Sequence, residues 1–194
     1  MRIAGVLLGG GESVRFGSPK LETLLEGKRL VDVACNHFLQ AGFDPVVFCG
    51  NVQPQDGRVF VVKPGAEMIE TLRNGLRALP QGAFAFAPAD MPALLPGLLR
   101  GLIRIFQAAG KRYMVPVHEG KRGHPAFALD SEAFLRLGEA GGAREVWKSA
   151  GDDLLHHEVP IADVLFDIDT PEDLAAAGDE VSRHTRLLAR GDFR

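Results

Sequence analysis

A cluster of glycines near the N-terminus is followed by two basic residues. The stretch GGGESVRFGSPK runs from Gly9 to Lys20. A backbone that lacks Cβ atoms can approach a ligand closely and turn its N–H groups toward anionic oxygens. Arg15 and Lys20 add fixed positive charge to the same loop. The residues predict a site for a phosphorylated ligand, and the alternative is a flexible turn with two solvated cations.

This loop fits neither of two common phosphate-binding motifs. A Walker A loop requires G-x-x-x-x-G-K-[ST], and both that spacing and the terminal pair are missing. A dinucleotide fingerprint counted from Gly9 has Val14 where the third glycine or alanine belongs. The failed fingerprint disfavours an NAD-dependent oxidoreductase.

Two acidic positions in the second half of the chain could hold a metal ion. Asp90 follows the apolar run Ala83 to Ala87, and Asp169 follows the run Val164 to Ile168. Mg²⁺ takes hard oxygen ligands and often only one or two carboxylates. The carboxyl ends of parallel strands meet above one crevice. We therefore expect Asp90 and Asp169 to lie within reach of one ion, with Asp167 as a less certain third acid.

Several of these polar residues also have structural explanations. Asp90 could form a turn before Pro92, and Asp169 could cap a helix that starts near Thr170. His124 could bind a phosphate or a ring edge, or could stabilise its own loop by a hydrogen bond. Two cysteines, Cys35 and Cys49, match no zinc or redox spacing and are expected to be small core residues.

The elements that must position these residues alternate along the chain. Strands are expected at Ile3 to Leu8, Val46 to Cys49, Val59 to Val62, Ala83 to Ala87, Tyr113 to Val117 and, last, Val164 to Ile168. Helices are expected at Lys28 to Ala41, Met68 to Leu79, Leu98 to Ala109, Ser131 to Leu137, Ala143 to Ala150 and after Thr170. Gly120 to Pro125 is expected to be a polar flexible loop, and His156-His157 a surface connection. This alternation predicts an α/β fold with a mainly parallel sheet and helices on both faces.

Length and composition limit the classes of protein that fit. The chain has 194 residues, 46% of them hydrophobic, and a formal net charge of −3. That is typical of one globular domain and gives no basic excess for binding nucleic acid. The sequence contains neither a run long enough to span a membrane nor a signal-peptide pattern. We therefore expect a cytoplasmic protein with no nucleic-acid or membrane partner.

The glycine loop resembles a known family signature, and three further motifs follow it in order. The signature L-A-[AG]-G-x-S-x-R-[MF]-G-x-x-K belongs to the MobA-like nucleotidyltransferase family, and here Gly9 replaces its alanine. The sequence ADMP at 89–92 is similar to the family's G-D-M-P, and GHP at 123–125 and DIDTPED at 167–173 match two more motifs. The resemblance covers about residues 3 to 175. The last two motifs point to the branch that contains molybdenum cofactor cytidylyltransferase.

The resemblance implies a fold and a set of site residues. The fold it implies is a single Rossmann-like nucleotidyltransferase domain over residues 1–194. Nucleotide contacts are implied for Leu8, Gly9, Gly10, Gly11, Arg15, Lys20, Asn51 and Thr71. Catalytic roles are implied for Arg15, Lys20 and Asp90, Mg²⁺ or Mn²⁺ binding for Asp90 and Asp169, and acceptor binding for Gly123, His124 and Pro125.

The function that the resemblance implies is transfer of CMP from CTP to the terminal phosphate of molybdopterin. GTP is the second choice of nucleotide, because Gly9-Gly10 looks partly like the guanylyl branch. A sugar phosphate or another small phosphate is the alternative acceptor. A molybdoenzyme or its chaperone would be the downstream protein partner. The alternative of a different class is a nucleotide-binding protein without catalytic activity. The presence of both Asp90 and Asp169 argues against it, because a protein that only binds nucleotide need not keep both acids.

Overall fold

One large sheet forms the centre of the structure, a computed structural model that describes residues 1–10, 19–137 and 142–178. Its strand order is β10-β7-β9-β6-β1-β4-β5, with β8 paired to β7. These strands are β1 (Ile3–Gly9), β4 (Val46–Gly50), β5 (Val59–Val62), β6 (Ala83–Pro88), β7 (Tyr113–His118), β8 (Lys121–Arg122), β9 (Ala126–Ala128) and β10 (Leu154–Glu158). A separate two-stranded ribbon consists of β2 (Leu24–Leu25) and β3 (Lys28–Arg29).

Most strands of the large sheet run in one direction. Strand β1 is parallel to β4 and β6, β4 is parallel to β5, and β7 is parallel to β10. The short β9 is antiparallel to both β6 and β7, so those two strands also share a direction. The carboxyl ends of β1, β4, β6 and β7 therefore meet at the same edge. The expectation of a mainly parallel α/β sheet is confirmed.

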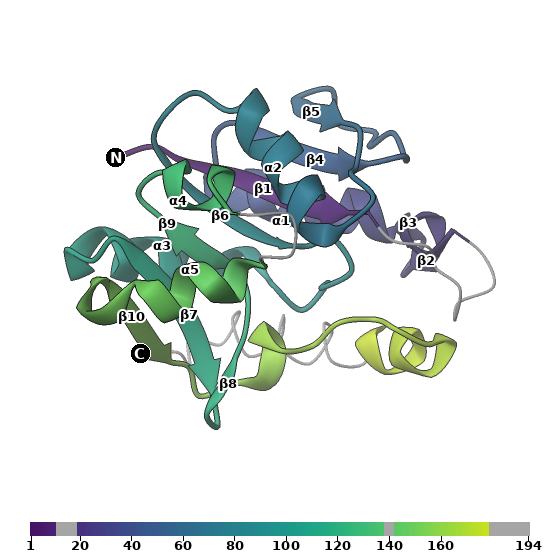
Figure 1. Ribbon diagram of the computed structural model, residues 1–194. Helices are drawn as coiled ribbons and strands as arrows, with labels where there is room; N and C mark the ends of the chain where they lie inside the picture. The colour runs from purple at the N-terminus through teal and green to yellow at the C-terminus, as the bar shows by residue number, and fades with distance from the viewer. Residues whose placement is uncertain (11–18, 138–141, 179–194) are drawn as a thin grey trace.

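Helices cover both faces of this sheet (Figure 1). Helices α1 (Leu30–Ala41) and α3 (Pro96–Ala109) pack on one face, and α2 (Met68–Ala78), α4 (Glu132–Leu135) and α5 (Ala143–Ser149) pack on the other. Alternate residues of β1 supply the two cores, with Ile3 and Leu7 in one and Val6 and Leu8 in the other. Burial on both faces explains why the strand reads as an unbroken apolar run.

The ends of two helices have the capping residues that the sequence predicts. Helix α1 ends at Gly42, whose φ of 97° is left-handed and suits a residue without Cβ. Residues 171–178 are helical, and the Asp173 amide donates to the Thr170 hydroxyl at 3.2 Å. The Thr170 amide in turn donates to the Asp173 carboxylate at 2.8 Å. This reciprocal pair is the capping box that the sequence indicates.

The prediction of a last strand at Val164 to Ile168 is wrong. A short 3-10 turn, η3 (Ala162–Val164), begins this segment, and residues 166–169 have no regular structure. Val164 and Ile168 are nevertheless fully buried, because the segment crosses below the sheet and inserts these side chains into two cores (Figure 1). These residues are apolar because their segment packs against the sheet, although it is not a strand of the sheet.

The last strand of the sheet is β10, which lies where a surface connection was expected. Its sequence LLHHE alternates poorly, and it pairs with β7 alone at the edge of the sheet. Two further boundaries also differ from expectation. Lys28 lies in β3, so α1 begins two residues later than predicted, and Lys121–Arg122 of the expected flexible loop form β8. Within the described ranges, the helices are too short or too polar to cross a membrane.

Candidate active site

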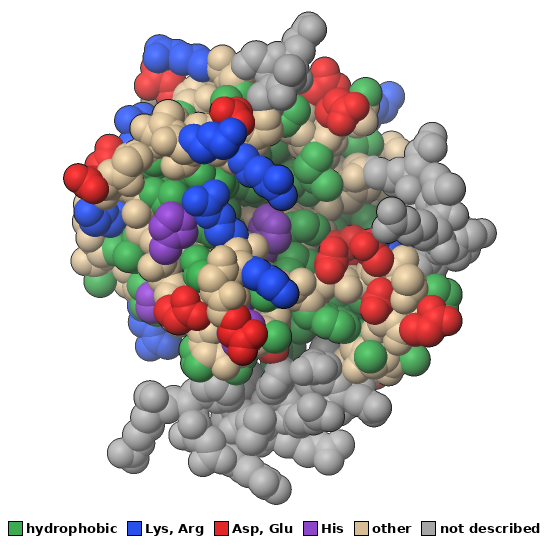
Figure 2. All heavy atoms as spheres, turned by 60° about the horizontal axis from the view of Figure 1, so that its bottom comes forward, with side chains coloured by type: hydrophobic (Ala, Val, Ile, Leu, Met, Phe, Trp, Pro, Cys, Tyr) green, Lys and Arg blue, Asp and Glu red, His purple; other side chains and the backbone are tan. Residues whose placement is uncertain are grey.

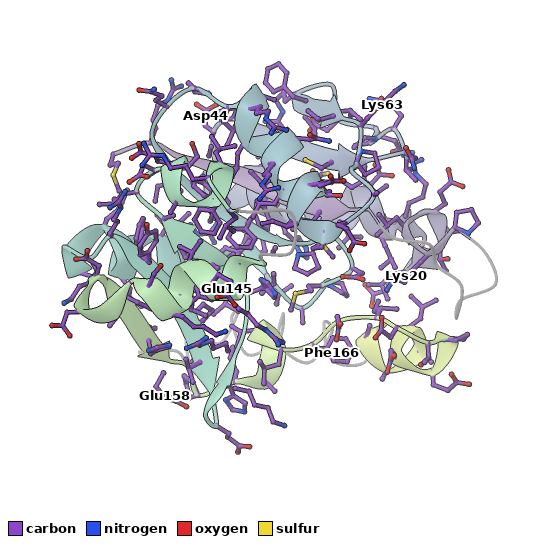
Figure 3. All side chains as sticks on the ribbon, viewed as in Figure 1. Lys20, Asp44, Lys63, Glu145, Glu158 and Phe166 are labelled. Carbon is purple, nitrogen blue, oxygen red and sulfur yellow. The ribbon has the colours of Figure 1, made fainter. Side chains whose placement is uncertain are left out.

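Three charged side chains from distant parts of the sequence meet at the carboxyl edge of the sheet. The Lys20 Nζ lies 2.6 Å from Asp90 Oδ2 and 3.2 Å from Asp169 Oδ1. It also donates to the Ile168 carbonyl at 2.5 Å. In Figure 3, Lys20 lies between the edge of the sheet and the segment that carries Phe166. We call Lys20, Asp90 and Asp169 the acidic centre.

Backbone hydrogen bonds fix the two loops that carry Asp90 and Asp169. The Ala89 amide donates to the Leu8 carbonyl at 2.9 Å, which joins the loop after β6 to the end of β1. The Ile168 amide donates to the Asp90 carbonyl at 3.0 Å, which joins the loop after η3 to the loop after β6. The position of Asp169 therefore depends on Asp90 although the segment between Val164 and Asp169 is not a strand.

The acidic centre is partly shielded from water and strongly coupled. The side chains of Lys20 and Asp90 are 14% and 19% exposed, whereas that of Asp169 is 53% exposed. Burial lowers the pKa of Lys20, but its hydrogen bonds and ion pairs with Asp90 and Asp169 outweigh this and raise it overall. Loss of hydration, with the negative charges of Asp169 and Asp90, raises the pKa of Asp167. The lysine is therefore a fixed cation among several acids.

The donor atoms at this centre fit a hard divalent cation. Asp90 Oδ1 is buried and has no hydrogen-bond partner among the residues that the structure describes. A buried carboxylate oxygen without a partner is costly, and a metal ion would satisfy it. The described residues contain no group of three or more His, Cys, Asp or Glu placed to hold a metal. Such a group is not required for Mg²⁺, which is often held by one or two carboxylates and substrate phosphates.

The start of the glycine loop packs against two neighbouring segments. A Cβ on Gly9 would lie 2.5 Å from the ring of Phe48, so only glycine fits beside this fully buried side chain. A Cβ on Gly10 would lie 2.7 Å from the hydroxyl of Thr71 and 3.0 Å from Pro64. Gly10 thus brings the backbone against the loop between β5 and α2. Gly11 and Arg15 lie outside the described residues.

The other residues expected on the nucleotide side differ in their surroundings. Thr71 is buried, and its hydroxyl accepts a hydrogen bond from the Gly65 amide at 3.0 Å. It therefore shapes the loop before α2 next to Gly10. Asn51 is exposed directly after β4, at the same edge of the sheet as Leu8.

The segment Gly123-His124-Pro125 lies on the other side of β1, beyond β6. The Gly123 amide donates to the Pro116 carbonyl and the His124 amide to the Val164 carbonyl, both at 2.8 Å. A side chain on Gly123 would overlap the Val164 backbone. Burial is the main influence on the His124 imidazole and lowers its pKa. Its Nδ1 is buried without a hydrogen-bond partner among the described residues.

A cavity of about 390 Å³ opens beside this segment. Its wall includes Leu8 and Pro88, at the carboxyl ends of β1 and β6. We call it the α5 cavity, and its lining residues are Leu8, Met68, Phe86, Pro88, Val115, Arg122, Gly123, His124, Ala126, Gly142, Ala143, Arg144 and Trp147. Figure 2 shows basic and histidine side chains grouped beside hydrophobic surface on this side of the molecule. Its volume is in the range of small-molecule sites, which is roughly 300–1,000 Å³.

Sequence reasoning identified only part of this cavity. It did not identify Phe86, Arg144 or Trp147, because none of them belongs to a motif. Phe86 was included in the apolar run Ala83 to Ala87 as an ordinary core residue. The one feature of the sequence that could have pointed to this cavity is the only tryptophan of the chain, which lies in a short helix after two glycines.

Comparisons with known proteins agree with this fold. The family model described as "MobA-like NTP transferase domain" matches residues 5–157. A comparison with curated protein sequences gave no match. Among solved structures, Rv0371c from Mycobacterium tuberculosis H37Rv is 25% identical with a TM-score of 0.78, covering 92% of this chain and 99% of that one. The same protein has also been solved in complex with manganese, at 21% identity and a TM-score of 0.70.

Two more solved structures share the fold at lower identity. The first is 2-C-methyl-D-erythritol 4-phosphate cytidylyltransferase from Thermus thermophilus, 17% identical with a TM-score of 0.68 over 94% of this chain and 100% of that chain. The second is molybdopterin-guanine dinucleotide biosynthesis protein A from Archaeoglobus fulgidus, 20% identical with a TM-score of 0.58 over 93% of this chain and 100% of that chain.

Proposed function

The chain belongs to the MobA-like NTP transferase family and is a nucleotidyltransferase, and from this premise we propose that it transfers CMP from CTP to the terminal phosphate of molybdopterin. In this reaction an oxygen of the acceptor phosphate bonds to the α-phosphorus of CTP. The bond from that phosphorus to the bridging oxygen of the β-phosphate breaks, and pyrophosphate leaves.

One observation supports the proposal: Lys20, at the end of the glycine motif, pairs with Asp90, which lies two residues after Pro88 of the α5 cavity wall. Lys20 contacts both Asp90 and Asp169. Leu8 borders the cavity on one side and leads into the glycine loop on the other. A triphosphate on the loop and a phosphate in the cavity would therefore meet at these charges, which is the arrangement that transfer between them requires.

The residues of the chain would act by position and charge. Asp90 and Asp169 would hold Mg²⁺ or Mn²⁺, which supplies Lewis-acid polarisation of the phosphates and neutralises their charge. Lys20 would balance negative charge that builds up as pyrophosphate leaves, and Arg15 is proposed to assist it. The acceptor phosphate is already a nucleophile, so the mechanism needs no strong general base. Backbone amides of Gly9 and Gly10 would help to orient the triphosphate.

The choice of CTP over GTP depends on motif resemblance. GHP at 123–125 and DIDTPED at 167–173 favour the cytidylyl branch. The glycine at position 9 argued for GTP, but its packing against Phe48 gives a reason for glycine that has nothing to do with the base. Asn51 and the loop shaped by Thr71 lie on the side where the base would bind.

Pyrophosphate release tests the proposal. Each of the four NTPs is incubated with Mg²⁺, with and without molybdenum cofactor, and released pyrophosphate is measured. We expect release that requires the cofactor and is fastest with CTP. Fastest release with GTP would place the chain in the guanylyl branch, and release only with another phosphate would change the acceptor. Tight NTP binding without any release would indicate a nucleotide-binding protein instead.

A further inference from the structure

We propose that helix α5 recognises the acceptor, with Trp147 packing against a planar heterocycle and Arg144 binding an anionic group on it. This inference rests on the proposed function, because it concerns the acceptor side of the same site. It names specificity-determining residues that belong to none of the four motifs. The ligand class it assigns is a phosphate ester of a flat ring system, as opposed to a flexible polyol phosphate.

The position of α5 supports this role. Arg144 and Trp147 of α5 line the α5 cavity together with His124 and Pro88. Pro88 is two residues from Asp90 along the chain. A ligand that fills the cavity of about 390 Å³ would therefore contact α5 and also Pro88, close to Asp90 in the chain.

The aromatic part of the wall is held in place before any ligand binds. The rings of Trp147 and Phe86 are nearly parallel, with an interplanar angle of 7° and centroids 6.3 Å apart. Tyr113 and Phe134 contact the indole edge to face, at centroid distances of 5.7 and 5.4 Å. Trp147 and Phe86 are only 8% and 4% exposed, so their orientation is fixed by packing. An aromatic wall that is already fixed by packing suits a flat ligand, because contact with it then costs little conformational entropy.

The charged part of the wall has a single sign. Arg122 and Arg144 line the cavity, and none of its described lining residues is Asp or Glu. Both arginines are exposed, and Arg144 can turn toward a ligand. Arg122 Nε lies 3.2 Å from His156 Nε2, which keeps it beside β10. Guanidinium groups bind phosphate or carboxylate oxygens through charge-assisted hydrogen bonds.

The hydrogen-bonding capacity of the cavity also favours a heterocycle. Besides Arg122 and Arg144, the described lining carries side-chain nitrogen or oxygen atoms only on His124 and Trp147. The remaining lining is mostly apolar or aromatic, so a polyol would bury several hydroxyl groups without partners there. A heterocycle with a few edge nitrogens and oxygens would leave far fewer groups unsatisfied.

Binding of two phosphate esters tests the proposal directly. The probes are 6-hydroxymethylpterin phosphate, which is planar, and sorbitol 6-phosphate, which is not. Affinity is measured by calorimetry, and the emission of Trp147 reports proximity because it is the only tryptophan of the chain. We expect the wild-type protein to bind the pterin ester at least about 10-fold more tightly than the polyol ester, with quenching of the indole emission.

Variants then assign the effect to α5. Arg144→Gln should weaken pterin-ester binding by about 10-fold or more, since it removes a charge-assisted contact. Lys148→Gln is the matched control, because Lys148 lies on the same helix and pairs with Glu145, but does not line the cavity. Trp147→Leu should reduce the preference for the planar ester, and Trp147→Phe should preserve most of it. If Trp147→Leu fails to fold, the affinities of Arg144→Gln and Trp147→Phe for the two esters still test the proposal.

The two proposals fail in distinguishable ways. Equal binding of both esters, or unchanged pterin-ester affinity in Arg144→Gln, would overturn the role of α5 even if pyrophosphate is released with CTP and molybdenum cofactor. Selective pterin-ester binding that depends on Arg144 and Trp147 would support it even if no pyrophosphate is released with any NTP.

Discussion

The acidic centre and the α5 cavity are neighbours, yet they are built in different ways. The acidic centre combines charged side chains that lie between 70 and 149 positions apart in sequence, and a backbone hydrogen bond joins the segments of Asp90 and Asp169. The α5 cavity is formed by rings of β6 and α5 that pack against the core, with two arginines at its wall. The acidic centre contains charges of both signs. The described residues that line the α5 cavity include two arginines and no Asp or Glu.

This difference suggests a division of labour between chemistry and selection. Charge stabilisation at the acidic centre would be needed for every nucleotide and acceptor, so changes there should reduce kcat. The shape and charge of the cavity would concern the acceptor alone, so changes there should raise the acceptor KM. The variants below either separate these two effects or show that the two regions act as one.

Asp90→Asn should have the largest effect. The amide keeps the size of the side chain but removes a charge that pairs with Lys20 and that would bind the metal. We expect kcat to fall by roughly 10³-fold or more, since metal-assisted charge stabilisation supplies several kcal/mol. Steady-state kinetics measure the loss, and thermal melting should show a folded protein. A higher acceptor KM with kcat unchanged would contradict the assignment of chemistry to this centre.

Lys20→Ala should reduce kcat by about 10²–10³-fold, because one preorganised contact to developing charge is removed. Lys28→Ala is a suitable control, since Lys28 is an exposed lysine in β3. Both variants are compared at saturating CTP and acceptor. If the folded Lys20→Ala variant turned over as fast as the control, Lys20 would have only a structural role, as the partner of the two aspartates.

Asp169→Asn should be milder, with a loss of about 10-fold. Its carboxylate is the more exposed of the two, and an amide oxygen can still coordinate a cation. The expected signature is a higher Mg²⁺ requirement with nearly normal kcat at saturating metal. A loss as large as that of Asp90→Asn, with no rescue by metal, would show that the two acids are equivalent.

Thr71→Val should affect the nucleotide side but not the cavity. It removes the hydroxyl that accepts from the Gly65 amide next to Gly10. The Gly65 amide is only partly buried, so its loss of a partner costs at most about 1–3 kcal/mol, and we expect a lower melting temperature and an NTP KM that rises several-fold. The acceptor KM should stay constant. An equal rise in both KM values would indicate that the two sides are mechanically coupled.

The stability of the protein should also depend on pH, through a histidine that belongs to neither region. Burial lowers the pKa of His37 in α1 from 6.5 to about 4. Between these values the unfolded chain takes up a proton that the folded chain does not. The free energy of unfolding should therefore decrease as the pH falls from 6.5 to 4, by up to about 3 kcal/mol. Chemical denaturation of the wild type and His37→Gln measures this, and identical pH dependence in both would refute it.

The parts of the fold and site that could be predicted from sequence are those set by local chemistry. Apolar runs located β1, β4, β5 and β6, and the capping pattern located the helix after Thr170. Motif order brought attention to Lys20, Asp90 and Asp169, which the structure places together. Their roles toward substrate and metal stay predictions.

The remaining features depend on tertiary packing, which no local pattern reports. Val164 and Ile168 resemble strand residues because they are buried, although they belong to a segment that crosses below the sheet. Strand β10 was missed because an edge strand needs only one covered face and tolerates His156 and His157. The α5 cavity was missed because Phe86 and Trp147 are far apart in sequence, and they line one space only after β6 and α5 pack together.

Transfer of label from CTP tests the central claim most directly. Molybdenum cofactor is incubated with the protein and CTP labelled with ³²P at either the α- or the γ-phosphate, with Mg²⁺ or with excess chelator. The account predicts that label enters the cofactor from α-labelled CTP alone, that the reaction requires the divalent ion, and that Asp90→Asn abolishes it. Label from the γ-phosphate, or full transfer in excess chelator, would contradict metal-assisted nucleotidyl transfer at the acidic centre.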